Sequence, residues 1–503
     1  SLLTMNFVNV NYDLTKYLPE TAESAIGLDV MRDKFGYPGT ARVMVKDVSL
    51  YEAKQYKDEI ADIDGVDQVL WCDSTVNIYA GEDFIDESEI KDYYKDRNAV
   101  YDITFVEESD STRTSTAIDE IKDLLGDKGC YVGMAVQNKS MTESMASEMS
   151  KILVVAVVMI FAVLSVTTTA WTEPILFLLV MGVAVLLNKG TNIFIGTVSF
   201  LTENVSIILQ LATSMDYSIF LLDAFMNYRK QGMNEEDAII NAVQEAINSI
   251  FASSLTTVVG FLALVTMKFS IGFDLGLVLA KGIVFSLLTV VFFMPAMILK
   301  FAKLNEKTKH RSFMPDFHGL GKVIYRIRPI VFAVIVLVTP LAYTAQGLND
   351  FLYGNDSMGA SEGTQVYEDD QEITKIFGRS NMLLALYPNT SEVNERAMAK
   401  EIKDLSYVKS VMALADTLPE GIPEEFLPKS TVELLHKGGY CRMLIYTRTK
   451  TESTEAFKDS DAIQEIVKKY YPDGSYLVGE TPSTQDIKSF IVKDYENVNV
   501  LSL

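Results

Sequence analysis

Cysteine and histidine are scarce in this chain, with only three of each among 503 residues. The cysteines are too few for a disulfide scaffold and lack the spacing of a metal-binding motif. All three histidines lie outside the long apolar runs. We therefore expect no histidine-based metalloenzyme, no metal site and no cofactor. Cys72 and Cys130 fall in the same part of the chain, so a disulfide between them and two free buried thiols are both open.

Basic residues are also under-represented, because 44 Lys and Arg oppose 67 Asp and Glu and give a formal net charge of −23. Proteins that bind nucleic acids need a basic footprint, so no nucleic-acid partner is predicted. The sequence contains no Walker-type phosphate loop. ATP is therefore not the expected energy source, and we expect a protein that is not an enzyme.

Long apolar runs are what the sequence has in abundance. Hydrophobic residues make up 49% of the chain, yet 22% of its residues are charged, which predicts both membrane-spanning and water-exposed parts. A helix needs about 20 mostly apolar residues to cross a bilayer core. Six stretches qualify, at 149–171, 174–188, 200–225, 250–267, 273–299 and 329–345. Buried helices of a soluble protein would account for one or two such stretches, but not for six.

Lys and Arg concentrate on one side of these predicted helices, at 229–230 and between 300 and 328. Cytoplasmic loops carry an excess of these residues, so we place that side in the cytoplasm and the protein in the cell membrane. The first predicted part is an extracytoplasmic domain at 1–148, followed by membrane helices two to six at 149–300 with a cytoplasmic amphipathic helix at 234–247. A basic cytoplasmic linker at 301–328 then leads to membrane helix seven at 329–345. The last predicted parts are a second extracytoplasmic domain at 346–496 and the start of membrane helix eight at 497–503.

The two extracytoplasmic regions share one order of elements. Each has a helix ending in Phe-Gly, at 35–36 and at 377–378, and then the pattern of strand, helix, two strands, helix and strand. This β-α-β-β-α-β order is ferredoxin-like, with helices covering one face of a four-stranded sheet. We predict two duplicated α+β domains that face each other over a groove. Apolar residues at both ends of the sequence resemble interrupted helices, so we also expect a fragment of a longer chain.

The segment ATSMDYSIFLLDAF at 212–225 resembles the fourth transmembrane helix of the resistance-nodulation-division (RND) superfamily, above all of its MMPL (mycobacterial membrane protein large) branch. The downstream stretches SIFASSLTTVVGFLAL and GIVFSLLTVVFFMPAMI are similar to that branch as well. The resemblance implies an RND-type fold and an exporter of lipids or other amphipathic molecules that works by proton antiport. It also implies a second Asp-Tyr pair in a tenth helix, beyond Leu503.

Asp216 and Tyr217 are the residues that we expect to form the proton relay of this half. Asp216 lies about two-thirds of the way along its predicted helix, where an ionised carboxylate costs at least about 2.5–3.5 kcal/mol. A carboxyl group at such a depth is typically functional, and Tyr217 could hydrogen-bond to it or to an ordered water. The alternative is a structural aspartate that ties helices together.

Further polar residues recur beside this pair. Glu203, Gln210 and Thr213 belong to a stripe on one face of the same helix, and we expect that stripe to contribute to the relay. Lys281, in a later helix, is predicted either to pair with an acid on a neighbouring helix or to extend its ammonium to the nearer membrane surface.

The preferred function is a secondary active transporter driven by the proton motive force. Its expected partners are protons and membrane lipids or another amphipathic substrate, with a path between the two extracytoplasmic domains. The sequence leaves open a homo-oligomer or envelope accessory proteins. Two alternatives remain, a non-transporting scaffold or sensor like the sterol-sensing relatives of the superfamily, and an accessory of protein export.

Overall fold

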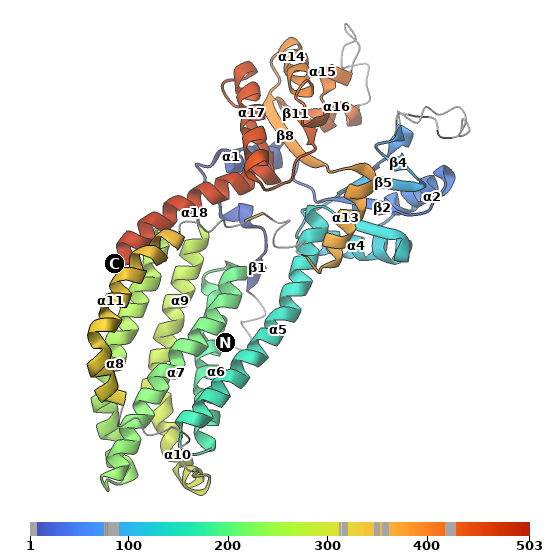
Figure 1. Ribbon diagram of the computed structural model, residues 1–503. Coiled ribbons are helices and arrows are strands. Elements are labelled where there is room, and N and C mark those ends of the chain that lie inside the picture. The colour runs from blue at the N-terminus through green and yellow to red at the C-terminus, as the bar shows by residue number, and fades with distance from the viewer. Residues whose placement is uncertain are drawn as a thin grey trace.

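The computed structural model describes residues 8–310 except 75, 77 and 79–89, together with 313, 320–346, 353–354, 362–417 and 429–502. Long helices form an elongated bundle, and two α/β domains lie together at one end of it (Figure 1). The domains and the bundle therefore occupy separate regions of the molecule.

The described residues contain six helices that are long and apolar enough to cross a membrane, as the sequence predicts. Their parts are α5 (Met134–Thr167), α6 (Thr172–Thr191), α7 (Phe200–Lys230), α8 (Glu235–Ala263), α9 (Ile271–Leu288), which continues through a π-helical turn (Thr289–Phe293) into α10 (Met294–Lys307), and α11 (Leu320–Gln346). Pro295 is the second residue after the π-helical turn. Since proline offers no backbone N–H to the preceding turn, the widened turn is the expected local response.

Helix α8 differs from the sequence prediction. The amphipathic segment 234–247 and the apolar segment 250–267 were expected as two helices, but α8 runs through both of them. Its buried side chains, among them Ala238, Ala242 and Ala246, pack into the core of the bundle. No glycine or proline separates the amphipathic segment from the apolar segment. Their apolar faces are therefore continuous, and a single helix can bury both of them.

The basic segment 301–328 is not simply a linker, since α10 extends to Lys307 and α11 begins at Leu320. The helices that contain the first and last predicted membrane segments also begin earlier than those segments. Helix α5 starts directly after strand β6 (Gly129–Val132), and α18 (Glu480–Ser502) starts directly after strand β12 (Tyr476–Gly479).

A glycine makes each of these strand-to-helix junctions possible. Gly133 and Gly479 have φ angles of 106° and 140°, which side-chain-bearing residues rarely adopt. A Cβ atom on Gly133 would lie 3.0 Å from the Cα of Ala41, and one on Gly479 would lie 2.9 Å from the carbonyl oxygen of Met382. Each domain therefore passes directly into a long helix through a residue that has room only as glycine.

The two α/β domains have the same strand order. In the first domain the main strands are β2 (Thr40–Val45), β3 (Val66–Leu70), β5 (Asn98–Phe105) and β6, and in the second they are β8 (Asn381–Pro388), β9 (Val408–Met412), β11 (Tyr440–Thr447) and β12. They pair antiparallel in the orders β3-β5-β2-β6 and β9-β11-β8-β12, which is the ferredoxin-like arrangement. Val43 and Val132 thus share a sheet, as the sequence predicts.

Among the described residues each sheet has five strands instead of the four that were expected. A two-residue strand, β4 (Tyr94–Lys95) or β10 (His436–Lys437), forms a hairpin with β5 or β11. Strands of two residues are too short for a hydrophobic alternation to reveal them. Two helices cover one face of each sheet, and they are α2 (Leu50–Ala61) with α4 (Thr112–Leu125) in the first domain and α14 (Glu392–Lys403) with α17 (Thr454–Tyr470) in the second.

The other face of each sheet is covered by a helix from the opposite domain. Helix α1 (Glu23–Lys34) precedes the first sheet in the chain but packs on the second, where Leu28 contacts the cluster around Leu386 and Val478. Helix α13 (Gln365–Phe377) precedes the second sheet but packs on the first, with Ile373 beside Met44. The exchange is visible in Figure 1, where α1 lies beside β8 and α13 beside β2.

Polar contacts reinforce the exchanged helices. The backbone N–H of Tyr131 donates to Asp369 of α13 over 2.9 Å. The Cys130 thiol and the Lys46 ammonium both donate to Glu372, each over 3.0 Å. Burial and these neighbouring acids raise the pKa of Cys130 to about 12. Cys130 and Cys72 are free thiols, so the disulfide left open by the sequence is not formed.

The domain end of the molecule is also fixed to the bundle. Phe269 lies in the loop between α8 and α9. Its backbone N–H donates to the carboxylate of Asp494 in α18 over 2.8 Å. The N–H of Ser270 donates to the carbonyl of Tyr17 over 2.9 Å. Both contacts connect segments next to the α/β domains with the ends of two membrane helices.

The exchange of α1 makes a testable prediction at Gly27. A Cβ atom there would lie 2.4 Å from Cγ1 of Val478 and 2.8 Å from Cβ of Tyr476, whereas a Cβ at Gly182 in α6 would meet nothing within 4 Å. Overpacking of this kind costs about 1–3 kcal/mol. We expect Gly27→Ala to lower the midpoint of thermal unfolding in detergent.

Gly182→Ala is the matched control, because alanine favours a helix over glycine by about 1 kcal/mol. It should leave the midpoint unchanged or raise it. Equal midpoints for the two variants would contradict the close packing of α1 on the second domain.

Candidate proton-relay site in the helix bundle

Helix α7 carries the predicted relay residues. It begins at Phe200, where the Ser199 side chain accepts from the N–H of Thr202, and it ends with Arg229 and Lys230 in the last turn. No glycine or proline interrupts its 31 residues. The direction of each side chain around the helix therefore follows from its position in the sequence. Asp216 lies near the middle of this helix, because α7 extends beyond the predicted end at 225.

The predicted polar stripe of α7 faces into the bundle. Ser206, Gln210 and Tyr217 are buried, and Glu203 and Thr213 are half-buried. Thr213 is satisfied within its own helix, because its hydroxyl donates to the carbonyl of Leu209 over 2.9 Å. The stripe is therefore a set of interior positions.

Gln210 is the centre of a buried hydrogen-bond network. Its side-chain oxygen accepts from the amide of Asn188 in α6 over 3.0 Å. Its amide donates to the carbonyl of Gly282 over 3.0 Å and to the hydroxyl of Ser286 over 3.3 Å, both in α9. A Cβ on Gly282 would lie 2.7 Å from the Asn188 amide nitrogen, so glycine is what lets α9 approach this closely. One side chain thus joins three membrane helices.

Two serines extend the network along the bundle axis. Ser214 Oγ lies 2.6 Å from the carbonyl oxygen of Gln210 and 2.5 Å from Oγ of Ser286. Ser286 Oγ in turn donates to the carbonyl of Gly282 over 2.9 Å. Since a hydroxyl carries one proton and can rotate, Ser214 can direct it to either acceptor, and the chain of hydroxyls can change its hydrogen-bond direction.

Lys281 forms no ion pair with an acid within the described part of the chain. Its ammonium donates to the carbonyl of Asn188 over 3.0 Å and to the side-chain oxygen of Asn192 over 2.5 Å. These acceptors lie at the C-terminal end of α6, where the helix dipole favours a positive charge. The predicted acid partner is therefore replaced by neutral oxygen acceptors at the end of a neighbouring helix. The alternative, in which the ammonium extends to the nearer membrane surface, stays a prediction.

Glu203 forms an ion pair with Lys189 of α6, at 2.5 Å between Nζ and Oε1. Its side chain is 17% exposed, so it lies at the edge of the bundle, close to the Asn188 end of the network. The order from this edge inward is Glu203, Asn188, Gln210 and then the two serines.

Asp216 lies on a different face of α7. It is exposed, as are Ala212, Phe220 and Asp223, which recur at three or four residues along one side of the helix. Adjacent residues of a helix point about 100° apart, so Asp216 and the buried Tyr217 diverge, and within the described part of the chain no hydrogen bond joins them. The structure does not bring Asp216 into the Gln210 network.

Sequence reasoning missed Lys189, Asn188 and Asn192 at the end of α6, and Ser286 in α9. The first three stand in the run NKGTN, which resembles an ordinary polar helix end. Ser286 is a lone hydroxyl in an apolar helix and carries no pattern. A usable signal was Gln210 itself, because a buried amide requires partners from neighbouring helices.

The network makes a prediction about stability. Gln210→Leu removes the acceptor of the Asn188 amide and leaves a buried polar group unsatisfied, which costs about 1–3 kcal/mol. We expect the midpoint of thermal unfolding in detergent to fall. Gln244→Leu, at an exposed position of α8, is the same substitution without a buried partner and should have little effect. The network would have no structural role if both variants melted together.

Comparison with known proteins finds membrane and transport proteins that are similar to parts of this chain. A Probable transport protein MmpL9 of Mycobacterium tuberculosis is 25% identical over 290 residues, which are 54% of this chain and 29% of that protein. The Putative membrane protein YdgH of Bacillus subtilis is 26% identical over 300 residues, 57% of this chain and 32% of that protein. The Putative membrane protein MJ1562 of Methanocaldococcus jannaschii is 39% identical over 89 residues, 18% of this chain and 23% of that protein.

The matched region thus covers less than half the length of each of these relatives. Their descriptions and the six apolar helices together identify a multi-pass membrane protein. The model of the MMPL family matches residues 19–326, which include the first α/β domain, α7 and the Gln210 network. Because this match extends over more than half of the sequence, the chain belongs to the MMPL family.

Proposed function

We propose that this chain is part of an exporter of lipids or other amphipathic molecules that is driven by the proton motive force. In this proposal it lies in the cell membrane, with both α/β domains on the extracytoplasmic side. The observation that carries the proposal is Asp216, a carboxyl group near the middle of a membrane-spanning helix and exposed on its surface.

An exposed carboxyl group at this depth has two stable environments. In contact with lipid it is favoured in the neutral form, because an ionised carboxylate costs at least about 2.5–3.5 kcal/mol there. Against a polar or basic group from another helix it is favoured in the charged form. Taking up or losing a proton therefore changes what this face of α7 packs against, which is what a coupling residue must do.

The Gln210 network supports this role by holding α7 in one rotation. Its hydrogen bonds to α6 and α9 keep the polar stripe inside the bundle. Asp216 is then held on a different face, where it is exposed among the described residues. In our proposal a further helix, carrying the second Asp-Tyr pair that the family resemblance implies, packs on this face.

The energy of one proton is sufficient to bias such a change. Moving one elementary charge through 100 mV releases about 2.3 kcal/mol, which shifts a two-state ratio about 50-fold at 1.4 kcal/mol per factor of ten. In the proposed mechanism this bias reaches the domains through α5 and α18, which continue directly from their sheets. The substrate then moves along a path between the two α/β domains.

The test is Asp216→Asn in the full-length protein, which keeps the shape of the side chain but removes the titratable proton. We expect efflux of a lipophilic dye such as Nile red, in cells that lack the native gene, to fall to background. Folding should be preserved, because a neutral amide costs less to bury than a charge. Blotting of membrane fractions measures the amount of inserted protein.

Asp223→Asn is the matched control, since Asp223 is an exposed acid on the same side of α7, two turns closer to its C-terminal end. It should retain efflux. Near-normal efflux in Asp216→Asn at equal protein level would refute proton coupling through this residue and favour the scaffold or sensor alternative.

A further inference from the structure

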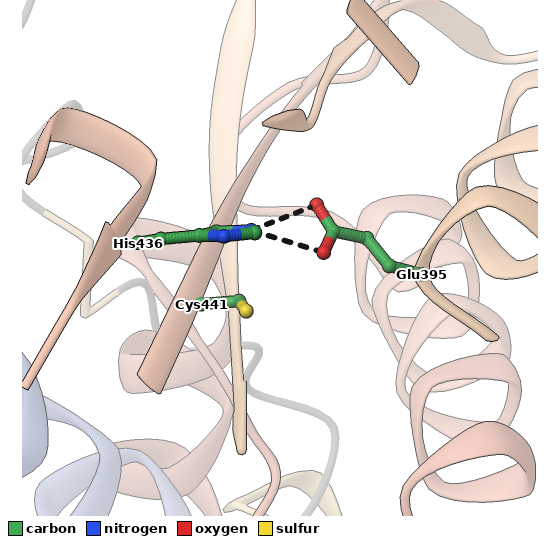
Figure 2. Close-up of side chains that lie close together, drawn as sticks. All are labelled: Glu395, His436 and Cys441. Carbon is green, nitrogen blue, oxygen red and sulfur yellow. Dashed lines mark hydrogen bonds and ion pairs between the residues drawn. The ribbon is translucent and has the colours of Figure 1, made fainter. Parts of the chain in front are cut away.

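A second polar cluster lies inside the second α/β domain. The Glu395 carboxylate, the His436 ring and the Cys441 thiol converge there, and Figure 2 shows the carboxylate directed at the ring with the sulfur atom beside them. His436 Nε2 is 3.0 Å from Glu395 Oε2, and one potential ligand atom from each residue lies within 4.8 Å of the others. Glu395 and Cys441 are each 1% exposed, and the side chain of His436 is 8% exposed.

A tight turn places His436 opposite Cys441. Gly438 and Gly439 join β10 to β11 with φ angles of 59° and 80°, as the two-residue hairpin turns with the correct twist require. The resulting register makes His436 and Cys441 cross-strand partners. Their side chains therefore project from neighbouring strands on the same face of the hairpin.

Glu395 reaches this face from the first turn of α14. Its Oε1 accepts from the backbone N–H of Ala415 over 3.2 Å, which fixes the orientation of the carboxylate. The sequence predicted no metal site because the cysteines lack metal-binding spacing, and Glu395 lies 41 residues before His436. Only the packing of α14 on the hairpin brings the third group to the other two.

The first α/β domain provides an internal comparison. The same place in its fold lies 342 residues earlier, so that Ala53 corresponds to Glu395, Tyr94 to His436 and Ala99 to Cys441. The first domain therefore has two alanines and a tyrosine at the positions of the three clustered residues. The scaffold does not require ionisable groups at these positions, and burying a charged pair is typically no more stable than apolar packing.

We propose that Glu395, His436 and Cys441 form a binding site for a divalent zinc ion. Thiolate, imidazole and carboxylate are the three ligand types that Zn²⁺ takes in proteins. Two negative ligands balance the charge of the ion. Three protein ligands leave one coordination position for water, as in exchangeable sites.

The geometry suits an ion with little rearrangement. With Zn–N and Zn–O bonds of about 2.0–2.2 Å, tetrahedral ligands stand about 3.4 Å apart. The His436 nitrogen and the Glu395 oxygen, at 3.0 Å, need to separate by only a few tenths of an ångström. Binding fastens the β10–β11 hairpin to α14.

Tyr387 lies beside the cluster. Its hydroxyl is buried without a hydrogen bond of good geometry in the described part of the chain. Glu395 and Cys441, two of the proposed ligands, are among its neighbours. A water on the open coordination position would give this hydroxyl an acceptor.

The experiment uses the whole chain purified in detergent and stripped of metal with EDTA. Zn²⁺ titration should show one tight site and raise the midpoint of thermal unfolding. Co²⁺ should give the near-ultraviolet absorption of a thiolate–metal bond. Cys441→Ser should abolish that absorption and weaken Zn²⁺ binding at least as much as loss of an outer-shell group does, about 10–100-fold.

Cys72→Ser is the matched control, because Cys72 is an equally buried free thiol in the first domain; it should keep both signals. A triple variant that copies the first domain, Glu395→Ala with His436→Tyr and Cys441→Ala, measures adventitious zinc on the acidic surface. The proposal is overturned if wild type binds no more Zn²⁺ than this variant or than Cys441→Ser, because the cluster is then only a buried ion pair beside a cysteine.

Discussion

The hydrocarbon interior of a bilayer offers no hydrogen-bond partners, and the architecture of the bundle depends on that constraint. Every polar group at membrane depth must find its partner within the protein. Gln210 meets this condition by bonding to α6 and α9, and Lys281 meets it at the C-terminal end of α6. Asp216 is exposed instead. That contrast distinguishes side chains that hold helices together from one that holds none together among the described residues.

The α/β domains are attached to the bundle by continuous backbone. Strands β6 and β12 pass into α5 and α18 through Gly133 and Gly479, with no loop between strand and helix. Helices α1 and α13 are exchanged, so each sheet is buried on both faces and neither domain can leave the other without exposing apolar surface. Each sheet is therefore joined both to its long helix and to the opposite domain.

Much of the fold could be predicted from the sequence, because its signals are local. Long apolar runs specify membrane helices, and the repeated order around Phe35 and Phe377 specifies two α/β domains of one kind. The exchange of α1 and α13 could not be predicted. The amphipathic pattern of a helix shows that one side is buried, but it does not say which of two similar sheets buries it.

The sequence by itself determined that Asp216 stands within a membrane helix and that Gln210 belongs to a polar stripe beside it. Only the tertiary structure decided that the stripe faces inward while Asp216 faces outward, and that Lys281 binds the end of α6. It alone also brought Glu395 to His436 and Cys441. The physical reason is the same in each case, because hydrogen bonds and ligand sets between elements depend on distances that chain packing fixes and residue spacing does not encode.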